Sequence, residues 1–286
     1  MKQKCENTLI YSLLLISVSA ISLAFEPEMV TKDLVGFWSF DQTTIKGKTA
    51  NDIWSKNHGT IKGAPKSVKG KFGQALSFDG KKDLVEIPHH ASLDLKKEAT
   101  IEFWFLLKGQ SGDNEYPRPV SKGQSLGDNS GYGVWVRDTR NPTDIGFRSI
   151  TLAPKDTRAQ GLPNYDDKDW HHVLLSFNGK KGTLYLDGEA IADQAVKGDL
   201  SQNKEPLHIA DALNQRHFNG LIDEVRIYKR GLTPAEAKQN FEIKTNSLSV
   251  QVAGKITTVW AKLKGAEKSA RNPWPECSFI DINFEL

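Results

Sequence analysis

The sequence has little cysteine: Cys5 and Cys277 are the two among 286 residues. Cys5 lies in an N-terminal stretch that we expect to be removed, so Cys277 would be the sole thiol of the exported chain. No internal disulfide is then possible, and the fold has to be held by its hydrophobic core or by a metal. We interpret Cys277 as an inert cysteine of the C-terminal segment, with pairing to another chain as the alternative.

A hydrophobic run of membrane-spanning length is also missing. Lys2 and Lys4 precede an apolar stretch, residues 9–24, which falls short of the about 20 residues that a membrane helix needs. The stretch ends in small residues, and Ser22 and Ala24 fit the −3 and −1 positions of a signal-peptidase site. These features are typical of a secretory signal.

We therefore predict a signal peptide over residues 1–24, with Val18 and Ala20 marking an alternative cleavage site and an uncleaved anchor as a second reading. The mature protein is then secreted, extracellular or on the cell surface, and it has no membrane span.

Charge of one sign is not strongly in excess. The formal net charge is +3, and it falls to +2 once Lys2, Lys4 and Glu6 leave with the signal. Nucleic-acid binding requires a concentrated basic surface. The sequence therefore gives no indication of a nucleic-acid partner.

Fixed-period repeats are absent, and what the sequence does contain is a series of short strand patterns. Aromatic and β-branched residues alternate with polar ones, or run together, between turn-forming clusters. The clearest patterns are "LVGFWSF", "ATIEFWFLL", "YGVWVR", "WHHVLLSF", "GTLYLDG" and "LIDEVRIY". Many short strands at even spacing predict an all-β fold, a two-sheet antiparallel β-sandwich of the jelly-roll type.

Two hairpins, one helix and one long loop can be placed within this pattern. Asn178-Gly179 and Asp187-Gly188 supply the positive φ angles of tight hairpin turns. Thr233, Pro234 and Glu236 form a capping box with proline at the first helical position, which predicts one short C-terminal helix. Residues 108–131 read as a polar loop, either functional or a mobile insertion. Residues 244–286 form a C-terminal segment of uncertain structure.

These stretches resemble the LamG-like jelly-roll domains of the concanavalin A-like superfamily, which also contains laminin G domains and pentraxins. The resemblance covers about residues 34–243 and rests on five motifs in order: "LVGFWSFD", "GKFGQALSFDGKKDLVEIP", "SLDLKKEATIEFWF", "DWHHVLLSFNGKKGTLYLDGE" and "FNGLIDEVRIYKRGLTPAEA". It implies a single jelly-roll domain over this range. Members include adhesion modules and sugar-binding modules, so the resemblance does not define the function.

Asp223 and Glu224 are the most conspicuous acidic pair. Whether their side chains can converge on one substrate bond decides whether this pair indicates a hydrolase. Consecutive residues of a strand point to opposite faces of a sheet, whereas two carboxylates that cleave a glycosidic bond converge about 5–9 Å apart. We therefore expect Asp223 to serve the fold and Glu224 to lie on the opposite face. Glu102 stands alone in its strand pattern. The sequence thus predicts no enzyme.

Calcium is the metal that the sequence favours. Asp41, Asp79, Asp83 and Asp223 lie at or near strand ends and offer the oxygen ligands that calcium prefers. Many related jelly rolls hold a calcium ion, so the resemblance implies one structural calcium. The alternative is that Asp79, like Asp187, only builds its Asp-Gly turn, and the same two interpretations stay open for Asp223. The histidine pairs, His89-His90 and His171-His172, do not provide the converging ligands of a zinc site.

Exposed aromatic rings would mark a sugar-binding surface, because a flat ring offers an apolar face to the C–H groups of a sugar. Trp54 and Tyr116 are expected to be exposed and to bind ligand. The remaining strand tryptophans are expected in the core: Trp38, Trp104, Trp135 and Trp170.

The expected function is that of a secreted, non-catalytic ligand-binding or adhesion module whose partner is an extracellular glycan or glycoprotein. Two alternatives belong to other classes. The first is a structural component of an extracellular assembly, joined through Cys277 and the C-terminal segment. The second is a polysaccharide-active enzyme, against which the missing carboxylate array argues.

Overall fold

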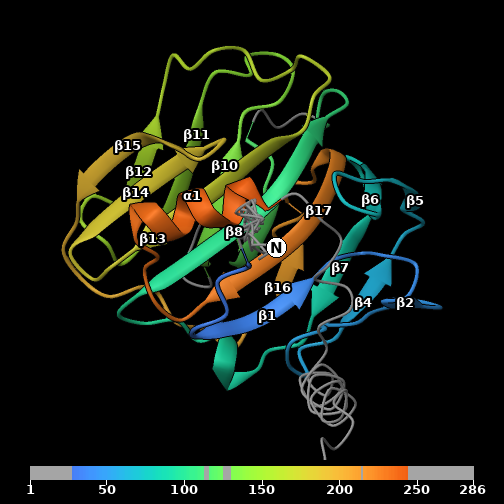
Figure 1. Cartoon of the computed structure of the whole chain (residues 1–286), viewed down its shortest axis with the longest axis horizontal. Helices are drawn as coiled ribbons and strands as arrows, with labels where there is room; N and C mark the ends of the chain where they lie inside the picture. The colour runs from blue at the N-terminus through green and yellow to red at the C-terminus, as the bar shows by residue number, and fades with distance from the viewer. Residues whose placement is uncertain (1–27, 113–115, 125–129, 214, 244–286) are drawn as a thin grey trace, which may run out of the picture.

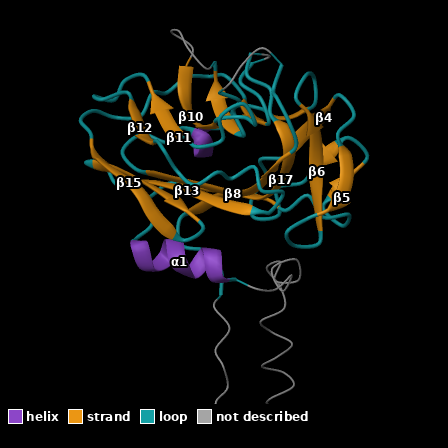
Figure 2. Ribbon diagram, turned by 90° about the horizontal axis from the view of Figure 1, so that it is seen from above, coloured by secondary structure: helices purple, strands orange, loops and turns teal. Residues whose placement is uncertain are grey.

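The computed structural model describes residues 28–112, 116–124, 130–213 and 215–243. Over these residues the chain forms two antiparallel sheets packed face to face, with one helix on an outer face (Figures 1 and 2). The predicted all-β sandwich with a short helix is thereby confirmed. The predicted signal peptide (1–24), the C-terminal segment (244–286) and both cysteines lie outside the described residues. Among the described residues, no helix has the length and apolar content to cross a membrane.

Sheet A contains eight strands. In spatial order they are β15 (Glu189–Ala195), β14 (Lys181–Leu186), β13 (His171–Phe177), β8 (Ala99–Leu107), β17 (Asn219–Tyr228), β6 (Gln74–Asp79) and β5 (Lys66–Lys69), with β1 (Leu34–Trp38) also paired to β17. Strand β15 is exposed along most of its length and carries Glu189 and Asp193, whereas the opposite edge, β5, carries Lys66 and Lys69. Both edges of sheet A are therefore charged.

Sheet B contains nine shorter strands. In spatial order they are β12 (Asp156–Ala159), β11 (Ile145–Ser149), β10 (Ser130–Val136), β9 (Val120–Gly123), β16 (Leu207–Ile209), β7 (Leu84–Ile87), β4 (Gly59–Lys62), β3 (Thr49–Ala50) and β2 (Ile45–Lys46). A 3-10 turn, η1 (Ala91–Leu93), follows β7.

The hydrophobic core lies between the two sheets and follows the alternation of side chains along each strand. On β13, Val173, Leu175 and Phe177 are fully buried between the sheets. His172 and Leu174 point to the outer face of sheet A, where His172 packs against the helix and Leu174 joins a smaller apolar cluster. Each large apolar side chain buried in this way contributes about 1.5–3 kcal/mol.

Strands β13, β14 and β15 form two successive hairpins, as the sequence predicted. Asp187 and Gly188, between β14 and β15, both have positive φ angles of 51° and 82°. Gly179, between β13 and β14, has a φ angle of 83°. Glycine reaches this region without a steric penalty, and aspartate tolerates it better than other side chains do.

The stretch 108–131, predicted as one polar loop, contains strand β9 in the middle of sheet B. The prediction was wrong here because β9 (VSKG) lacks an apolar alternation, and its lysine is buried. The Lys122 ammonium lies 2.9 Å from the carbonyl oxygen of Asn203 and 2.8 Å from that of Glu205. Hydrogen bonds of this kind offset the cost of burying a charged side chain.

Strand β17 contains an irregularity at Glu224 that overturns the prediction for the acidic pair. The φ angle of Glu224 is 54°, and the register against β8 shifts between Asp223 and Arg226. A bulge of this kind adds one residue to the strand and interrupts the alternation of faces. Ile222 and Val225 enter the core between the sheets, whereas Asp223 and Glu224 both lie on the outer face of sheet A. Their predicted separation onto opposite faces is wrong.

Arg226 forms the centre of a buried ionic cluster on this outer face. It is 1% exposed and donates hydrogen bonds to Glu224 and, over 3.1 Å, to Oε1 of Glu102. His172 Nε2 lies 3.3 Å from the other oxygen of Glu102. Burial opposes the charge of Glu102, but Arg226 holds the pKa of this carboxyl below its usual value. Removing one partner from such a cluster leaves an uncompensated buried charge.

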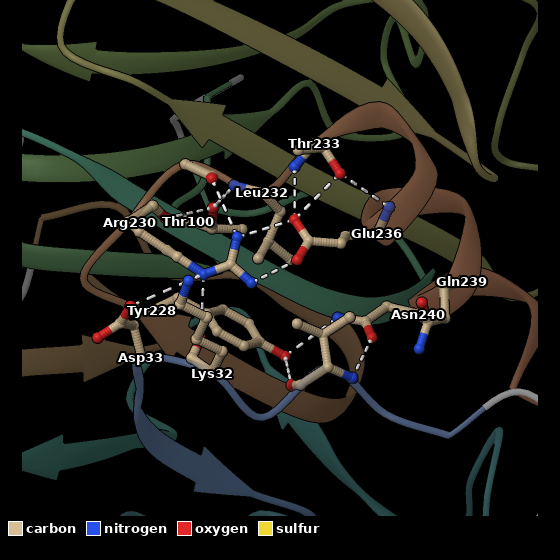
Figure 3. A network of polar contacts seen from close by, with 12 residues as sticks. Lys32, Asp33, Thr100, Tyr228, Arg230, Leu232, Thr233, Glu236, Gln239 and Asn240 are labelled. Carbon is tan, nitrogen blue, oxygen red and sulfur yellow. Dashed lines mark hydrogen bonds and ion pairs between the residues drawn. The ribbon is translucent and has the colours of Figure 1, made fainter.

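Helix α1 (Pro234–Glu242) lies over the outer face of sheet A (Figure 2), and its Asn240 contacts Glu102 of this cluster. It begins with the predicted capping box: the Thr233 hydroxyl accepts a hydrogen bond from the Glu236 N–H at 3.3 Å, and the Glu236 carboxylate accepts one from the Thr233 N–H at 2.9 Å. Arg230 binds both carboxylate oxygens of Glu236, at 2.8 and 2.6 Å (Figure 3). The first turn of α1 is thereby tied to the end of β17.

The far end of α1 is held by Asn240, which is 1% exposed. Its amide donates to Glu102 at 2.9 Å and to the Tyr228 hydroxyl at 3.0 Å, and its oxygen accepts from the Val30 N–H at 2.9 Å. The Tyr228 hydroxyl donates to the Val30 carbonyl at 3.0 Å. Helix α1, two central strands and the segment before β1 therefore share one polar network.

We expect Glu236→Gln to lower the free energy of unfolding by about 1–3 kcal/mol, because it removes the two-point ion pair with Arg230, whereas the Gln oxygen still accepts the Thr233 N–H. The hydrogen bonds to Arg230 lower the pKa of Glu236 to about 2. This carboxylate therefore stabilises the fold above its usual pKa of 4.5, and the contribution is lost as the pH falls toward 2. Thermal melts between pH 2.5 and 7 should show a weaker acid dependence in Glu236→Gln. Glu242→Gln, at the exposed end of the same helix, is the matched control and should behave like wild type.

Asp223→Asn should melt no lower than wild type at pH 8 in calcium-free buffer. Burial and the neighbouring Glu224 raise the pKa of Asp223 well above 3.8. The unfolded chain then releases this proton at a lower pH than the folded chain, so wild type loses stability as the pH rises above about 4. Melting temperatures measured at pH 5 and pH 8 should show that Asp223→Asn becomes more stable relative to wild type as the pH rises.

Two further variants control for this result. Asp223→Ala also removes the acceptor of the Phe72 N–H, which lies 3.1 Å away, and should melt lower than wild type at both pH values. Glu224→Ala removes a partner of buried Arg226 and should cost on the order of 3 kcal/mol. If Asp223→Asn melts as low as Asp223→Ala at both pH values, Asp223 is needed in its ionised form and the interpretation fails.

Candidate ligand-binding site

The four aspartates predicted as metal ligands lie in two separate places. Asp79 and Asp83 belong to the turn between β6 and β7. Oδ1 of Asp79 accepts the N–H groups of Lys81, Lys82 and Asp83 at 2.9, 3.0 and 3.1 Å, and Oδ1 of Asp83 accepts the Ala64 N–H at 2.8 Å. Burial opposes the charge of Asp79, but these N–H groups hold its pKa below the usual value. Both side chains therefore build backbone turns.

Asp41 and Asp223 meet at the turn between β5 and β6. Oδ1 of Asp41 accepts the Gln74 N–H at 3.0 Å, and Oδ2 of Asp223 accepts the Phe72 N–H. Gln74 and Asp79 are the two ends of β6, about 16 Å apart at the usual strand rise. The four aspartates therefore do not converge on one ion, and no group of three His, Cys, Asp or Glu in the described part of the chain is arranged to hold a metal.

The two rings predicted to bind ligand are both exposed, Trp54 by 45% and Tyr116 by 37%. They do not form one surface. Trp54 follows β3 and Tyr116 precedes β9, and β4, β7 and β16 lie between these two strands in sheet B. Each ring therefore has to be considered as a separate candidate.

Of the four tryptophans predicted in the core, Trp38 joins the core between the sheets. Trp104 is buried on the outer face of sheet A, where it stacks on Phe241 of α1 with 5.7 Å between ring centroids. Trp170 is half-buried. Trp135 is 6% exposed but lies on the outer face of sheet B, where it borders a pocket.

This pocket has a volume of about 270 Å³. Trp135, Arg148, Arg158 and Asp156 of its lining belong to β10, β11 and β12. These three strands lie on the side of the sandwich opposite to α1 (Figure 2). The pocket lining combines two aromatic rings, four arginines and two aspartates: Tyr116, Trp135, Arg118, Arg148, Arg158, Arg216, Asp144 and Asp156.

Glycines on the outer face of the sheet leave room for the larger side chains of the pocket. Gly146 lies between Trp135 and Arg158 in the strand register. A Cβ atom at Gly146 would come within 2.3 Å of the Trp135 ring, so the indole has to lie against this glycine. Two residues further along these strands, Gly133 of β10 is the cross-strand partner of Arg148 of β11. The alternation that sends Val134 into the core thus directs Trp135 to the pocket.

Tyr116 is positioned by two contacts. Its ring lies 5.3 Å from the Trp135 ring at an angle of 82°, an edge-to-face arrangement. The Arg137 guanidinium lies 5.0 Å from the centroid of Tyr116. Aromatic pairs and cation–π contacts of this kind each stabilise by about 0.5–1.5 kcal/mol. An exposed ring is thereby held at the pocket rather than left to rotate.

The arginines of the pocket come from segments that are distant in the sequence. Arg148 of β11 binds Asp156 of β12 through two hydrogen bonds of 2.7 and 2.5 Å. The Arg118 N–H donates to the Arg216 carbonyl at 2.8 Å, which places these two arginines side by side. Burial, together with the nearby charges of Arg216 and Arg148, lowers the pKa of Arg118 to about 9. Positive charge is therefore concentrated in a small space.

Sequence reasoning found Tyr116 but missed Trp135 and the four arginines. Arg148 and Arg158 each alternate with buried residues of a short strand, in "IGFRS" and "DTRA". This alternation was a signal for an outward-facing cation. Arg118 and Arg216 lie outside strands, and no local pattern brings them together.

Asp223 and Glu224 take no part in this site. They are 0% and 4% exposed, and they lie on the other sheet, on the face where Trp104 packs against α1. A polysaccharide chain does not reach carboxylates at this depth. The acidic pair that dominates the sequence therefore belongs to the fold.

Solved structures with a similar fold include binding modules and enzymes. The binding domain of Paraclostridial Mosquitocidal Protein 1 has a TM-score of 0.58 and 16% identity, covering 73% of this chain and 52% of that chain. Domain 4 of AbnA, a GH43 extracellular arabinanase from Geobacillus stearothermophilus in complex with arabinotriose, has a TM-score of 0.56 and 17% identity, covering 73% and 98%. Trypanosoma rangeli sialidase in complex with sialic acid has a TM-score of 0.55 and 16% identity, covering 74% and 33%.

This chain thus spans about half the length of the mosquitocidal binding domain and a third of the sialidase. At these identities the similarity concerns the fold alone. A sequence model described as the concanavalin A-like lectin/glucanases superfamily matches residues 79–238, more than half of the 286 residues. Since the two antiparallel sheets agree with that match, the chain belongs to the concanavalin A-like lectin/glucanase superfamily.

Proposed function

We propose that this protein is a non-catalytic carbohydrate-binding module and that it holds a sugar in the pocket over β10–β12. The observation that carries the proposal is the combination of a positioned, exposed ring, Tyr116, with converging arginine side chains in one pocket. A ring offers an apolar surface to the C–H groups of a sugar. Guanidinium groups supply several hydrogen-bond donors for its oxygens.

The size of the pocket limits what it holds. Pockets for drug-sized molecules measure about 300–1,000 Å³, and this one measures about 270 Å³. It therefore suits one sugar unit, or the end of a glycan chain, with the rest of the glycan in solvent. The arabinotriose complex of AbnA domain 4 supports a sugar ligand for a module of this fold.

The non-catalytic role is supported by the carboxylates of the pocket. Asp156 is held by Arg148 in a two-point ion pair, and Asp144 lies 3.5 Å from the Arg137 guanidinium. Carboxylates in such pairs orient arginines and are poorly suited to donate a proton to a leaving group. A screen for reducing-sugar release with the whole chain tests this part, and turnover that is lost in Asp144→Asn or Asp156→Asn would contradict it.

Export fits the proposal, because glycans of cell surfaces and extracellular matrices are met outside the cell. The predicted signal over residues 1–24 supports a secreted or cell-surface location for the mature protein.

Tyr116→Ala should weaken binding to the cognate glycan by about tenfold, because about 1–1.5 kcal/mol is expected from ring contacts. A glycan array identifies the ligand, and titration calorimetry measures the dissociation constant. Trp54→Ala is the matched control, since it removes the other exposed ring from the opposite half of sheet B, and it should bind like wild type. If only Trp54→Ala loses glycan binding, the binding site lies at Trp54 and not in this pocket. If the protein binds no glycan at all, the proposed function is wrong.

The calcium prediction is tested by chelation. A bound ion stabilises the folded chain, so the prediction requires EDTA to lower the melting temperature of wild type and to leave Asp223→Ala nearly unchanged. If wild type melts at the same temperature with and without EDTA, the prediction of a bound calcium ion is wrong. Asp223 would then act only as the acceptor of the β5–β6 turn.

A further inference from the structure

We propose that the sugar held in this pocket is acidic and that the arginines of the lining bind its carboxylate. These arginines are Arg148 of β11, Arg158 of β12, Arg118 before β9 and Arg216 before β17. This inference rests on the proposed function and specifies the chemical class of the ligand. It is carried by the number and placement of the charged groups that line the pocket.

Four arginines face two aspartates in the lining of this pocket. Arg118 is 4% exposed and next to Arg216 through a backbone hydrogen bond. Guanidinium groups gathered at this depth repel one another, and the lowered pKa of Arg118 reflects both its burial and this repulsion. An anion that entered the pocket would relieve the repulsion, whereas a neutral sugar would not.

Arg158 is the exposed arginine of the β11–β12 pair that lines the pocket. Its side chain is exposed and makes no hydrogen bond or ion pair with the described part of the chain. Its position on β12 is two residues from Asp156, whose carboxylate fixes Arg148 through two hydrogen bonds. Arg148 is therefore held in place by the protein, and Arg158 is available to a ligand.

The shape of these groups favours a carboxylate. The planar fork of a guanidinium matches the two oxygens of a carboxylate and forms paired hydrogen bonds with them. Tyr116 supplies an apolar face beside the same charges. A sugar ring that carries a carboxylate directly on it meets both requirements, as uronic acids of polysaccharides and sialic acids of glycoproteins do.

Titration calorimetry with matched pairs of ligands tests the inference. The first pair is trigalacturonic acid and its methyl ester, which has the same sugar backbone without the charge. The second pair is sialyllactose and its methyl ester, and the two pairs distinguish the two sources of the carboxylate. We expect at least one acidic ligand to bind about tenfold more tightly than its neutral partner, with an affinity that falls as the salt concentration rises.

Arg158→Gln should abolish this preference: the acidic ligand should lose about tenfold in affinity, and the neutral ligand should lose much less. Lys155→Gln is the matched control, because it removes an equal charge from an exposed residue just before the same strand, outside the pocket lining, and it should keep the preference. Both substitutions are at exposed positions, so a failure to fold would not obscure the result.

The other outcomes separate the two proposals. Equal binding of acidic and neutral ligands, lost in Tyr116→Ala, would overturn the acidic ligand and leave the carbohydrate-binding function standing. A preference that survives in Arg158→Gln, or that holds for sulfated sugars and not for carboxylated ones, would also overturn the inference. If no sugar binds, the proposed function itself fails.

Discussion

The buried contact between Arg226 and two glutamates is the constraint on which sheet A and its helix depend. Arg226 and Glu224 belong to β17, and Glu102 belongs to β8, so the ion pairs join the two central strands of the sheet. A guanidinium at 1% exposure requires these partners. Asn240 contacts the same Glu102 from helix α1. The helix therefore sits where it adds a hydrogen bond to a charged group that is buried away from water.

The two outer faces of the sandwich consequently differ in what they offer to other molecules. On sheet A, α1 closes the polar cluster, and aromatic side chains such as Phe241 and Trp104 cover its margin. On sheet B, short strands with glycines on the outer face leave space above β10–β12, and long cationic side chains surround that space. The face with the more conspicuous carboxylates is structural, and the face with scattered arginines is open.

The sequence predicted those features that depend on neighbours in the chain. Strand alternation located β8, β13 and β17, positive-φ residues located two hairpins, and Thr233 with Glu236 located the start of the helix. The bulge at Glu224 was not predictable, because no glycine marks it and Glu102, the second carboxylate that Arg226 binds, is more than a hundred residues away. Strand β9 was missed because its lysine is satisfied by carbonyls of another loop. The pocket was missed for the same reason: tertiary structure, and no local pattern, brings its arginines together.

The charged edges of sheet A have a consequence for how copies of the protein meet. An exposed edge strand offers unpaired N–H and C=O groups to any other strand. On β15 these groups are flanked by Glu189 and Asp193, and on β5 by Lys66 and Lys69. Two copies that approached through the same edge would place like charges opposite each other, which opposes strand pairing. The arrangement therefore protects a β-rich protein against symmetric sheet extension at high concentration.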